Sequence, residues 1–421
     1  MHGIRESLQF TILILHLSIS DSMTTSDSTT TNDAILSLSK IIEENYKARE
    51  EEVKERLLKL IKCGVCDDKG IVIMAVDQGF EHGPVKSFDV NPAAYDPLYH
   101  LDLAVECGLN GIAAPLGFME TIYGSDNYEK ICKILKLNSN CSAIHEGEHS
   151  QALLSTPEDA VRLGCDGIGM TIYPGTGKSN VRMMERASRM IAEARERGLF
   201  SVIWSYPRGD GVKGEEQSVD NISYAVHIAC MLGADIVKVK MPKIHDMDSI
   251  AREISKYFTD GERWYDNEYS KKMHGLDDYS CIALAINYLE QLRKHSVALN
   301  STQEQNRIKV LQDGLSNYFE QLKNKKIISI EKVMQAAFDS RRIVIFSGGE
   351  TKAIGEVERD IMYAIDGGGN GSIIGRNVFQ RPREEAITLL NDITGLYRMR
   401  DESLLTSLLR LENAKLKNTA A

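Results

Sequence analysis

The stretch Gly233-Ala-Asp-Ile-Val-Lys-Val-Lys-Met-Pro-Lys243 places two lysines inside an apolar run rich in β-branched residues. Its centre, Asp235 to Lys240, has the composition of a short buried strand that follows a helix-like segment ending at Gly233. Residues two apart on a strand point to the same face, so if Lys238 faces a packed interior then Lys240 does as well. We therefore expect a buried strand that carries amines.

Two ammonium groups on such a strand would disfavour each other's charge. Their stems lie about 6.6 Å apart, and at an effective dielectric of about 20 the charges repel by roughly 2.5 kcal/mol. Burial adds a second penalty on the charged form, so both effects lower the lysine pKa. A neutral lysine is the nucleophile with which proteins form Schiff bases with carbonyl compounds. The alternative is that both lysines lie in solvent past the strand end, and this strand alone does not decide.

The composition is that of an ordinary globular protein, with 43% hydrophobic and 26% charged residues among 421. This length fits one large α/β domain with insertions or two domains. The net charge of -10, without any run rich in lysine and arginine, argues against nucleic acid as a partner. An acidic protein that binds an anionic substrate must gather its positive groups locally.

The amino-terminal segment contains an apolar run, Leu8 to Ile19, that is too short to span a membrane and has the pattern of a weak signal peptide. Met23 then precedes a stretch rich in serine, threonine and aspartate that we expect to be disordered. We favour a translation start at Met23 and interpret residues 1–33 as a disordered or wrongly assigned segment. A charged helix, Ala34 to Lys62, would form a helical extension over residues 34–69. We expect no membrane partner.

The eight cysteines are scattered through apolar segments, as Cys107, Cys165 and Cys230 illustrate. This distribution is typical of reduced core thiols in a cytoplasmic protein. Cys63 and Cys66 form a single C-x-x-C pair, which is weak evidence for zinc or redox chemistry without a second pair nearby. We therefore expect no zinc or redox site at this pair. We also expect no metal and no cofactor elsewhere in the chain.

From Gly70 onward a unit repeats that consists of a short apolar strand, a loop, an amphipathic helix and a glycine. Eight such units with nearly continuous apolar strands predict a (β/α)8 TIM barrel over residues 70–415 rather than an open sheet. The expected strands are Ile71 to Asp77, Gly111 to Leu116, Cys141 to Glu146, Gly167 to Tyr173, Phe200 to Tyr206, Asp235 to Lys240, Arg342 to Ser347 and Gly371 to Gly375. The expected helices include Ala94 to Cys107, Pro157 to Leu163, Lys178 to Arg197 and Ser218 to Leu232.

The repeat is interrupted between Met241 and Ile330, where we expect a helical insertion at about residues 244–329. It contains the helical patterns Ser280 to Lys294 and Thr302 to Lys325, and it follows the carboxyl end of the sixth strand, the face where barrel enzymes hold their active sites. A lid, an oligomer contact and a loop without catalytic part all fit it. The tail from Glu384 to Lys417 predicts a closing helix and a short extra helix.

Polar residues follow the strands at their carboxyl ends, which meet at one mouth of a barrel. They are Asp77, Trp204, Tyr206, Lys238, Lys240, the turn Ser347-Gly348-Gly349, and Gly375 with Arg376. Glycine-rich turns after the seventh and eighth strands present backbone N–H groups to a phosphate, and an arginine adds a matching charge. The alternative is that these glycines only permit tight loops.

A lysine amine, a carboxylate, a phenol and a phosphate cradle suit carbon–carbon bond chemistry on a phosphorylated ketose. Lys238 would form an imine whose positive nitrogen stabilises the carbanion left by cleavage. Tyr206 can move a proton to or from the substrate, and Asp77 can act on the carbinolamine or hold Lys238 in position.

These motifs, in this order, closely resemble the archaeal-type class I fructose-bisphosphate aldolases of the DeoC/FbaB family. The resembling segments are Ala75 to Pro84, Thr171 to Gly175, Trp204 to Gly209, Ala234 to Lys240, Phe346 to Gly349 and Ile374 to Gln380. The resemblance implies that Lys238 is the Schiff-base lysine and Tyr206 the proton-transfer residue, with Asp77 and Trp204 in the active site. It assigns the turn at Ser347, Gly348 and Gly349 with Gly375 and Arg376 to phosphate, and we add Lys240 to the substrate-binding group. It also implies a metal-independent homo-oligomer in glycolysis or gluconeogenesis.

One apparent departure concerns the third strand, after which the family carries Lys-Leu-Asn. Here we align Ile144-His145-Glu146 with that motif, which would remove a basic group from the mouth. The same region contains His145-Glu-Gly-Glu-His149, an H-E-x-x-H pattern that binds zinc on a helix, although its central glycine disfavours a helix. The competing hypotheses are a related lysine aldolase or transaldolase on another phosphorylated keto compound, a zinc hydrolase, and a non-catalytic barrel.

Overall fold

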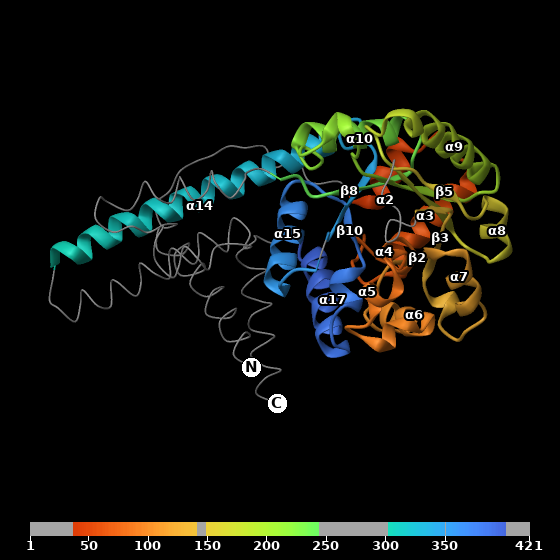
Figure 1. The fold of residues 1–421 in the computed structure, drawn as a ribbon, viewed down its shortest axis with the longest axis horizontal. Helices are drawn as coiled ribbons and strands as arrows, with labels where there is room; N and C mark the ends of the chain where they lie inside the picture. The colour runs from red at the N-terminus through yellow and green to blue at the C-terminus, as the bar shows by residue number, and fades with distance from the viewer. Residues whose placement is uncertain (1–36, 141–148, 244–301, 350, 401–421) are drawn as a thin grey trace. The chain divides into compact units, whose positions relative to one another are not determined.

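The computed structural model describes residues 37–140, 149–243, 302–349 and 351–400 (Figure 1). The chain divides into two units, of which one comprises residues 1–31 and 243–326 and the other residues 32–242 and 327–421. Helix α14 (Thr302–Ala336) begins in the first unit, and its last turns belong to the second. It confirms the helix predicted from Thr302 and continues past the predicted end at Lys325. The helix predicted at Ser280 to Lys294 lies outside the described residues.

The second unit contains a closed barrel of eight parallel strands, which confirms the predicted (β/α)8 fold. In chain order the barrel strands are β1 (Ile71–Ala75), β2 (Gly111–Pro115), β3 (Cys132–Lys136), β6 (Gly167–Ile172), β7 (Phe200–Ser205), β8 (Ile236–Lys240), β9 (Ile343–Ser347) and β10 (Gly371–Ile374). A separate antiparallel pair joins β4 (Asn138–Ser139) to β5 (Ala152–Leu153).

The third strand is the one strand that the sequence misplaced. The predicted segment Cys141 to Glu146 lies outside the described residues, and the barrel position belongs to β3. Lysines at 130, 133 and 136 recur every three residues, as on the polar face of a helix. On the strand they separate instead: Lys133 points to the outer face, where its Nζ donates to Glu129 Oε2 at 2.9 Å, and Lys136 points inward. The pairing of Lys133 with Glu129 and of Lys136 with Asp77 allows both lysines to be buried on a strand despite their helical spacing.

Two helices, not one, precede the barrel. The chain predicted as a single helix from Ala34 to Lys62 forms α2 (Leu38–Asn45) and α3 (Glu51–Cys63), and residues before 37 are outside the described part. The break lies at Tyr46, whose hydroxyl donates to the Asp235 carbonyl at 2.5 Å and accepts from the Ile343 amide at 3.1 Å. These hydrogen bonds anchor the extension to Asp235, just before β8, and to Ile343, the first residue of β9, so α2 and α3 cover the amino end of the barrel.

Helices surround the strands, as the ring of ribbons in Figure 1 shows. They are α4 (Gln78–His82), α5 (Pro84–Phe88), α6 (Pro97–Glu106), α7 (Leu116–Ile122), α8 (Pro157–Arg162), α9 (Gly177–Glu196), α10 (Val219–Met231), α15 (Ile354–Asp366), α16 (Arg376–Phe379) and α17 (Arg383–Arg398). Short 3-10 turns are η1 (Pro92–Tyr95), η2 (Tyr128–Lys130) and η3 (Asp210–Val212). Among the helices that the structure describes, none has the length and apolar character needed to cross a membrane.

The helix predicted from Ala94 to Cys107 is interrupted near its start. Its first residues form η1, and α6 begins only at Pro97, where Asp96 accepts a hydrogen bond from the Leu98 amide at 3.0 Å. Proline fits the first helical position because its missing N–H has no partner there. The helices predicted at 157–163, 178–197 and 218–232 are confirmed by α8, α9 and α10. The closing helix is α17, and the predicted extra helix lies outside the described residues.

The strand alternation decides which side chains enter the barrel. Ile134, Val202 and Ile236 belong to the buried interior cluster. Because residues two apart share a face, Lys136, Trp204 and Lys238 continue these rows inward, one step closer to the carboxyl end. The barrel interior therefore changes from apolar to polar between one inward-facing residue of these strands and the next.

Candidate active site

Every residue that the sequence assigned to a site lies at the carboxyl end of the barrel. Asp77 precedes α4, Trp204 and Tyr206 lie at the end of β7, and Lys238 and Lys240 lie on β8. Ser347 ends β9 and is followed by Gly348 and Gly349, and Gly375 precedes α16, whose first residue is Arg376. The structure therefore brings the predicted residues to one mouth.

The Lys238 amine lies in a buried aromatic environment. The residue is only 5% exposed, and its Nζ lies 5.2 Å from the centre of the Trp204 indole and 5.8 Å from the Tyr206 ring. Burial is the main cause that lowers the pKa of Lys238 to about 7; the Asp77 charge opposes it and the Lys136 charge adds to it. The neutral amine, which can attack a carbonyl, is thus available near neutral pH.

A second buried lysine, Lys136, was not found from the sequence. It is 2% exposed at the end of β3, its Nζ lies 3.6 Å from Asp77 Oδ2, and it donates to the Asn138 carbonyl at 2.8 Å. Its Nζ also lies 5.4 Å from the centre of the Trp204 ring. Burial lowers the pKa of Lys136, while the nearby Asp77 and Glu81 charges act in the opposite direction. Both amines therefore contact the same indole.

The predicted departure at the third strand is wrong. The Lys-Leu-Asn motif consists of Lys136, the last residue of β3, with Leu137 and Asn138, so the basic group is present at the mouth. Asn138 fixes this segment, because its Nδ2 donates to the Thr171 carbonyl at 2.8 Å and its Oδ1 accepts from the Thr171 amide at 2.7 Å. The motif was visible in the sequence, and only the strand assignment hid it.

The expected repulsion between Lys238 and Lys240 also needs correction. The cation that lowers the pKa of Lys238 most is Lys136 on another strand. Lys240 lies half-buried at the end of β8, where it is in register with Ser347 of β9. Lys240 thus stands at the rim on the side of the glycine-rich turns.

Tyr206 and Trp204 complete the wall of the mouth. Burial, followed by the charges of Asp77 and Glu81, holds the pKa of Tyr206 well above its usual range, and a hydrogen bond with Ser347 opposes this shift. The phenol is therefore protonated at neutral pH. The indole N–H of Trp204 has no hydrogen-bond partner among the described residues, although it is buried.

Glu81 brings a second carboxylate to the site, which the sequence interpretation did not assign. Its Oε1 accepts a hydrogen bond of 3.1 Å from the Tyr173 hydroxyl, which itself accepts from Gln151 Nε2 at 2.9 Å. The Glu81 charge acts on Lys136, Lys238 and the Tyr206 phenol. Tyr173, which follows β6, therefore holds the Glu81 carboxylate near the amines of Lys136 and Lys238.

The glycine-rich turns after β9 and β10 lie side by side. Asn377 joins them, because its Nδ2 donates to the Gly348 carbonyl at 3.0 Å while its Oδ1 accepts from the Lys352 amide at 2.8 Å. A Cβ at Gly375 would lie 2.7 Å from the Ala75 carbonyl oxygen, so only glycine fits there. Gly349 has a φ of +69°, which glycine adopts without strain. Arg376 directly follows the second of these turns as the first residue of α16.

The zinc and redox alternatives gain no support from the described residues. His145 lies outside them, and the His149 ring packs 5.8 Å from the Tyr173 ring. In the described ranges no group of three histidine, cysteine or acidic side chains is arranged to hold a metal ion. Cys63 and Cys66 are both free thiols, and burial raises the pKa of Cys66 to about 12.

Comparisons with known proteins point in one direction. Residues 71–381 match the DeoC/LacD family of aldolases. A class 1 fructose-bisphosphate aldolase from Halobacterium salinarum is 34% identical over 55% of this chain and 88% of that protein. A Methanocaldococcus jannaschii fructose-bisphosphate aldolase/6-deoxy-5-ketofructose 1-phosphate synthase is 36% identical over 46% of this chain and 63% of that protein. A crystal structure of an archaeal fructose 1,6-bisphosphate aldolase matches with a TM-score of 0.56 and 24% identity, covering 82% of this chain and 99% of that one.

Proposed function

The chain belongs to the DeoC/LacD family of aldolases, and from this membership we propose that it is a class I fructose-bisphosphate aldolase. This lyase cleaves fructose 1,6-bisphosphate reversibly to dihydroxyacetone phosphate and glyceraldehyde 3-phosphate through a Schiff base, without a metal ion. The observation that carries the proposal is the buried Lys238 amine on the Trp204 indole, with its pKa lowered to about 7.

Lys238 is the nucleophile in this proposal. Its neutral amine attacks the keto carbon, and loss of water from the carbinolamine leaves an iminium ion. The bond between C3 and C4 then breaks, and its electron pair moves toward the iminium nitrogen to form an enamine. The C4 fragment leaves as glyceraldehyde 3-phosphate. Protonation of the enamine at C3 and hydrolysis of the resulting iminium ion then release dihydroxyacetone phosphate and restore the lysine.

Lys136 and Asp77 form the polar wall beside the nucleophile. Their 3.6 Å ion pair places a positive charge near Lys238, and both amines lie within 5.4 Å of the indole centre. Lys136 thereby favours the neutral form of Lys238. The Asp77 carboxylate can take and return the proton that the carbinolamine needs to lose water.

Tyr206 is the proton carrier between the substrate carbons. In the direction of synthesis its protonated phenol donates to the aldehyde oxygen as the new carbon–carbon bond forms. In cleavage the phenol first loses its proton to water while the iminium ion is present, and the phenolate oxygen then receives the proton of the C4 hydroxyl. The positive iminium nitrogen near the ring stabilises the phenolate during this transfer, because opposite charges at short range favour the ionised form.

The turns after β9 and β10 hold a substrate phosphate in this proposal. Ser347 to Gly349 and Gly375 follow the carboxyl ends of β9 and β10, where backbone amides in glycine-rich turns suit a phosphate, and Arg376 adds a charge. Lys240, in register with Ser347, extends this positive rim. The same chemistry supports a second candidate, a lysine aldolase on another phosphorylated keto compound, which the double name of the Methanocaldococcus relative favours.

We also propose a cytoplasmic homo-oligomer, with the barrel at residues 70–415 and an insertion at about residues 244–329. Tyr224 and Met231, seven residues apart on α10, are 64% and 69% exposed and lie on the same helix face. Such an exposed apolar stripe suits contact with a second copy. Light scattering of Met231→Glu should show a smaller particle than the unchanged chain, and an unchanged mass would remove this face from the interface.

The test of the proposed reaction is borohydride trapping with dihydroxyacetone phosphate, with and without a chelator, followed by peptide mass mapping. We expect a chelator-insensitive adduct on Lys238. Lys238→Met should give none, while the matched variant Lys240→Met should keep it. An adduct on Lys240, or none on a folded protein, would overturn the assignment, and incubation with several aldehydes would separate the two candidate substrates.

A further inference from the structure

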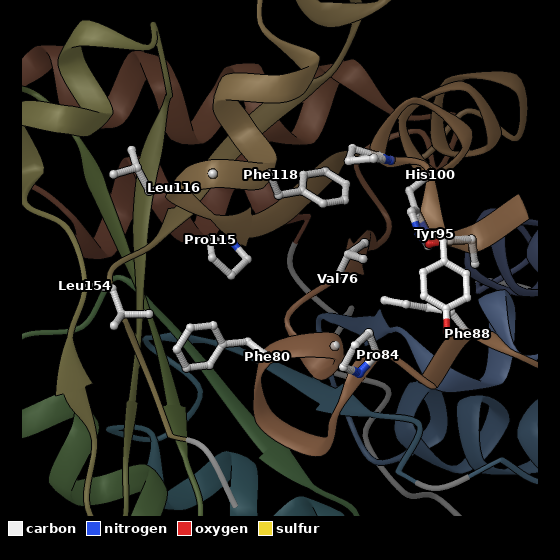
Figure 2. A pocket seen from close by; sticks show the side chains of 14 residues that line it. Val76, Phe80, Pro84, Phe88, Tyr95, His100, Pro115, Leu116, Phe118 and Leu154 are labelled. Atoms are coloured by element: carbon white, nitrogen blue, oxygen red, sulfur yellow. Dashed lines mark hydrogen bonds between the residues drawn. The ribbon is translucent and has the colours of Figure 1, made fainter. Parts of the chain in front are cut away.

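An apolar cavity of about 470 Å³ lies beside the mouth, between the segment that carries α4 to α6 and the start of α7. Figure 2 shows its labelled side chains arranged around a hollow, with Phe80 and Leu154 on one side and Phe118 and Tyr95 on others. The volume falls within the range of about 300–1,000 Å³ that small-molecule sites occupy. No residue assigned to the aldolase reaction lines it.

The described residues that line this cavity carry no charge. Among them there is no lysine, arginine, aspartate or glutamate, and the titratable side chains are Tyr95 and His100. His100 Nε2 lies 2.8 Å from the Ala94 carbonyl oxygen, so this nitrogen carries the hydrogen and donates it. Burial lowers the pKa of His100 to about 4, which keeps the imidazole neutral. A phosphorylated sugar would lose its hydration without compensation here, so the cavity is not a second substrate site.

Aromatic rings give the cavity its shape. His100 packs against Phe118 with ring centres 5.8 Å apart and tilted by 51°, and Phe88 packs against Tyr95 with centres 5.4 Å apart and an angle of 67°. Phe80 and Tyr95 stand at the rim and remain 49% and 46% exposed. Tilted ring pairs leave an edge or a face against which a further planar ring can pack. A bound aromatic molecule would also bury the exposed rings of the rim.

The cavity shares its walls with the segments that hold the catalytic ion pair. Val76 and Gly79 line it, and they stand on either side of Asp77. On the opposite side the amide of Leu154 donates to the carbonyl of Leu137 at 2.7 Å, and Leu137 follows Lys136. A molecule in the cavity would therefore press on both chain segments that set the 3.6 Å separation of Asp77 and Lys136.

We propose that this cavity is an effector site for a small, uncharged, aromatic molecule, and that its occupancy alters the rate of imine formation at Lys238. The effector part rests on the proposed aldolase reaction, whereas the binding part does not. The chemical class follows from the uncharged walls, the volume and the ring geometry.

Indole serves as the probe, and its binding is measured by titration calorimetry on the full chain. We expect saturable binding at one site. Gly117→Leu should weaken it by about tenfold or more, because Gly117 lines the cavity and a Cβ there has no neighbour within 4 Å, so the added side chain occupies open space without a clash. Ala94→Leu fills the cavity from its buried wall and is the second variant. The control Val181→Leu, 62% exposed on α9, should bind indole normally.

The second measurement is the rate of borohydride trapping with dihydroxyacetone phosphate. Saturating indole should change this rate by about twofold or more in the unchanged chain and in the control, and not in Gly117→Leu.

Absence of saturable binding, or binding that survives both filling variants, would overturn the site. Binding with an unchanged trapping rate would overturn the effector role. Loss of indole binding after the lysine adduct has formed would place indole in the catalytic mouth and would also overturn the proposal. A chain that binds indole at the cavity but traps no substrate would reject the aldolase reaction instead.

Discussion

The two ends of the barrel bury charge in opposite ways. At the amino end, Asp235 is fully buried and accepts hydrogen bonds from Arg49 Nε and from the amide and hydroxyl of Ser201, both at 2.9 Å. At the carboxyl end, Lys238 is also buried, yet it has no carboxylate within 4.0 Å among the described residues. The first arrangement satisfies a charge and stabilises the fold, whereas the second removes the charge and leaves a reactive amine.

Lys238→Met tests the carboxyl end and has the largest expected effect. Aldolase activity should fall by about 10⁴-fold or more, because the proposed imine forms on the amine that this variant removes. The free energy of unfolding should rise by about 1–4 kcal/mol, since an apolar side chain replaces an unpaired amine.

The pH dependence of that gain follows from the sign of the pKa shift. The folded pKa of about 7 lies below the ordinary value of 10.5, so between these values the unfolded chain binds the proton and the folded chain does not. Below pH 7 the buried amine therefore lowers the free energy of unfolding by its full amount. This loss becomes smaller as the pH rises toward 10.5. Urea unfolding at pH 6 and pH 10 should show a larger gain at pH 6, and an equal gain at both would contradict the shift.

Asp235→Ala tests the amino end. It leaves the buried Arg49 guanidinium without its carboxylate and the Ser201 amide without its acceptor, so the free energy of unfolding should fall by about 3–5 kcal/mol. The specific activity of the folded fraction should remain. The control is Glu120→Ala, which breaks the exposed 2.9 Å pair with Arg162 and should cost about 1 kcal/mol or less. Equal losses in the two variants would mean that burial does not distinguish the ends.

The way in which charges are buried also explains which parts of the barrel could be predicted from the sequence. Strands β1, β2 and β6 to β10 were predicted within two residues, because their apolar runs and flanking glycines are local signals. The third strand failed because Lys133 and Lys136 are buried by partners, Glu129 and Asp77, of which only the first is close in sequence. The predicted site residues did converge, but the cation that lowers the pKa of Lys238 most, Lys136, comes from β3 and was missed.

Two other features lay beyond sequence reasoning for a physical reason. The break between α2 and α3 depends on Tyr46, whose hydrogen bonds reach Asp235 and Ile343, far along the chain. The aromatic cavity combines residues 76–118 with Leu154, and each of its rings alone resembles an ordinary core residue. Local patterns specify elements, whereas charge compensation and cavities arise only when distant elements meet.

Lys136→Met sharpens the account of the carboxyl end. This variant removes the Lys136 charge, which lowers the pKa of Lys238, and keeps the Asp77 charge, which raises that pKa. The pKa of Lys238 should therefore rise. The midpoint of imine formation should move upward by about one pH unit, and the trapping rate at pH 7 should fall by about fivefold relative to the plateau. Lys240→Met should shift the midpoint less. A midpoint that stays or moves down would show that Lys136 does not set the reactivity of Lys238.

The amino end also contains a strained turn, which lies just before β9. A substitution in this turn has the smallest expected effect on the free energy of unfolding. Phe338, Asp339 and Ser340 all have φ values between +58° and +60°, the left-handed region that side chains disfavour. Asp339→Gly should therefore raise the free energy of unfolding by about 1 kcal/mol, measured by urea titration, because the relief of strain outweighs the greater freedom of glycine in the unfolded chain. The exposed control Asp126→Gly, whose φ is not positive, should destabilise slightly. A loss in Asp339→Gly would mean that this turn is held by side-chain contacts, and the amino end would then owe its stability to more than paired charges.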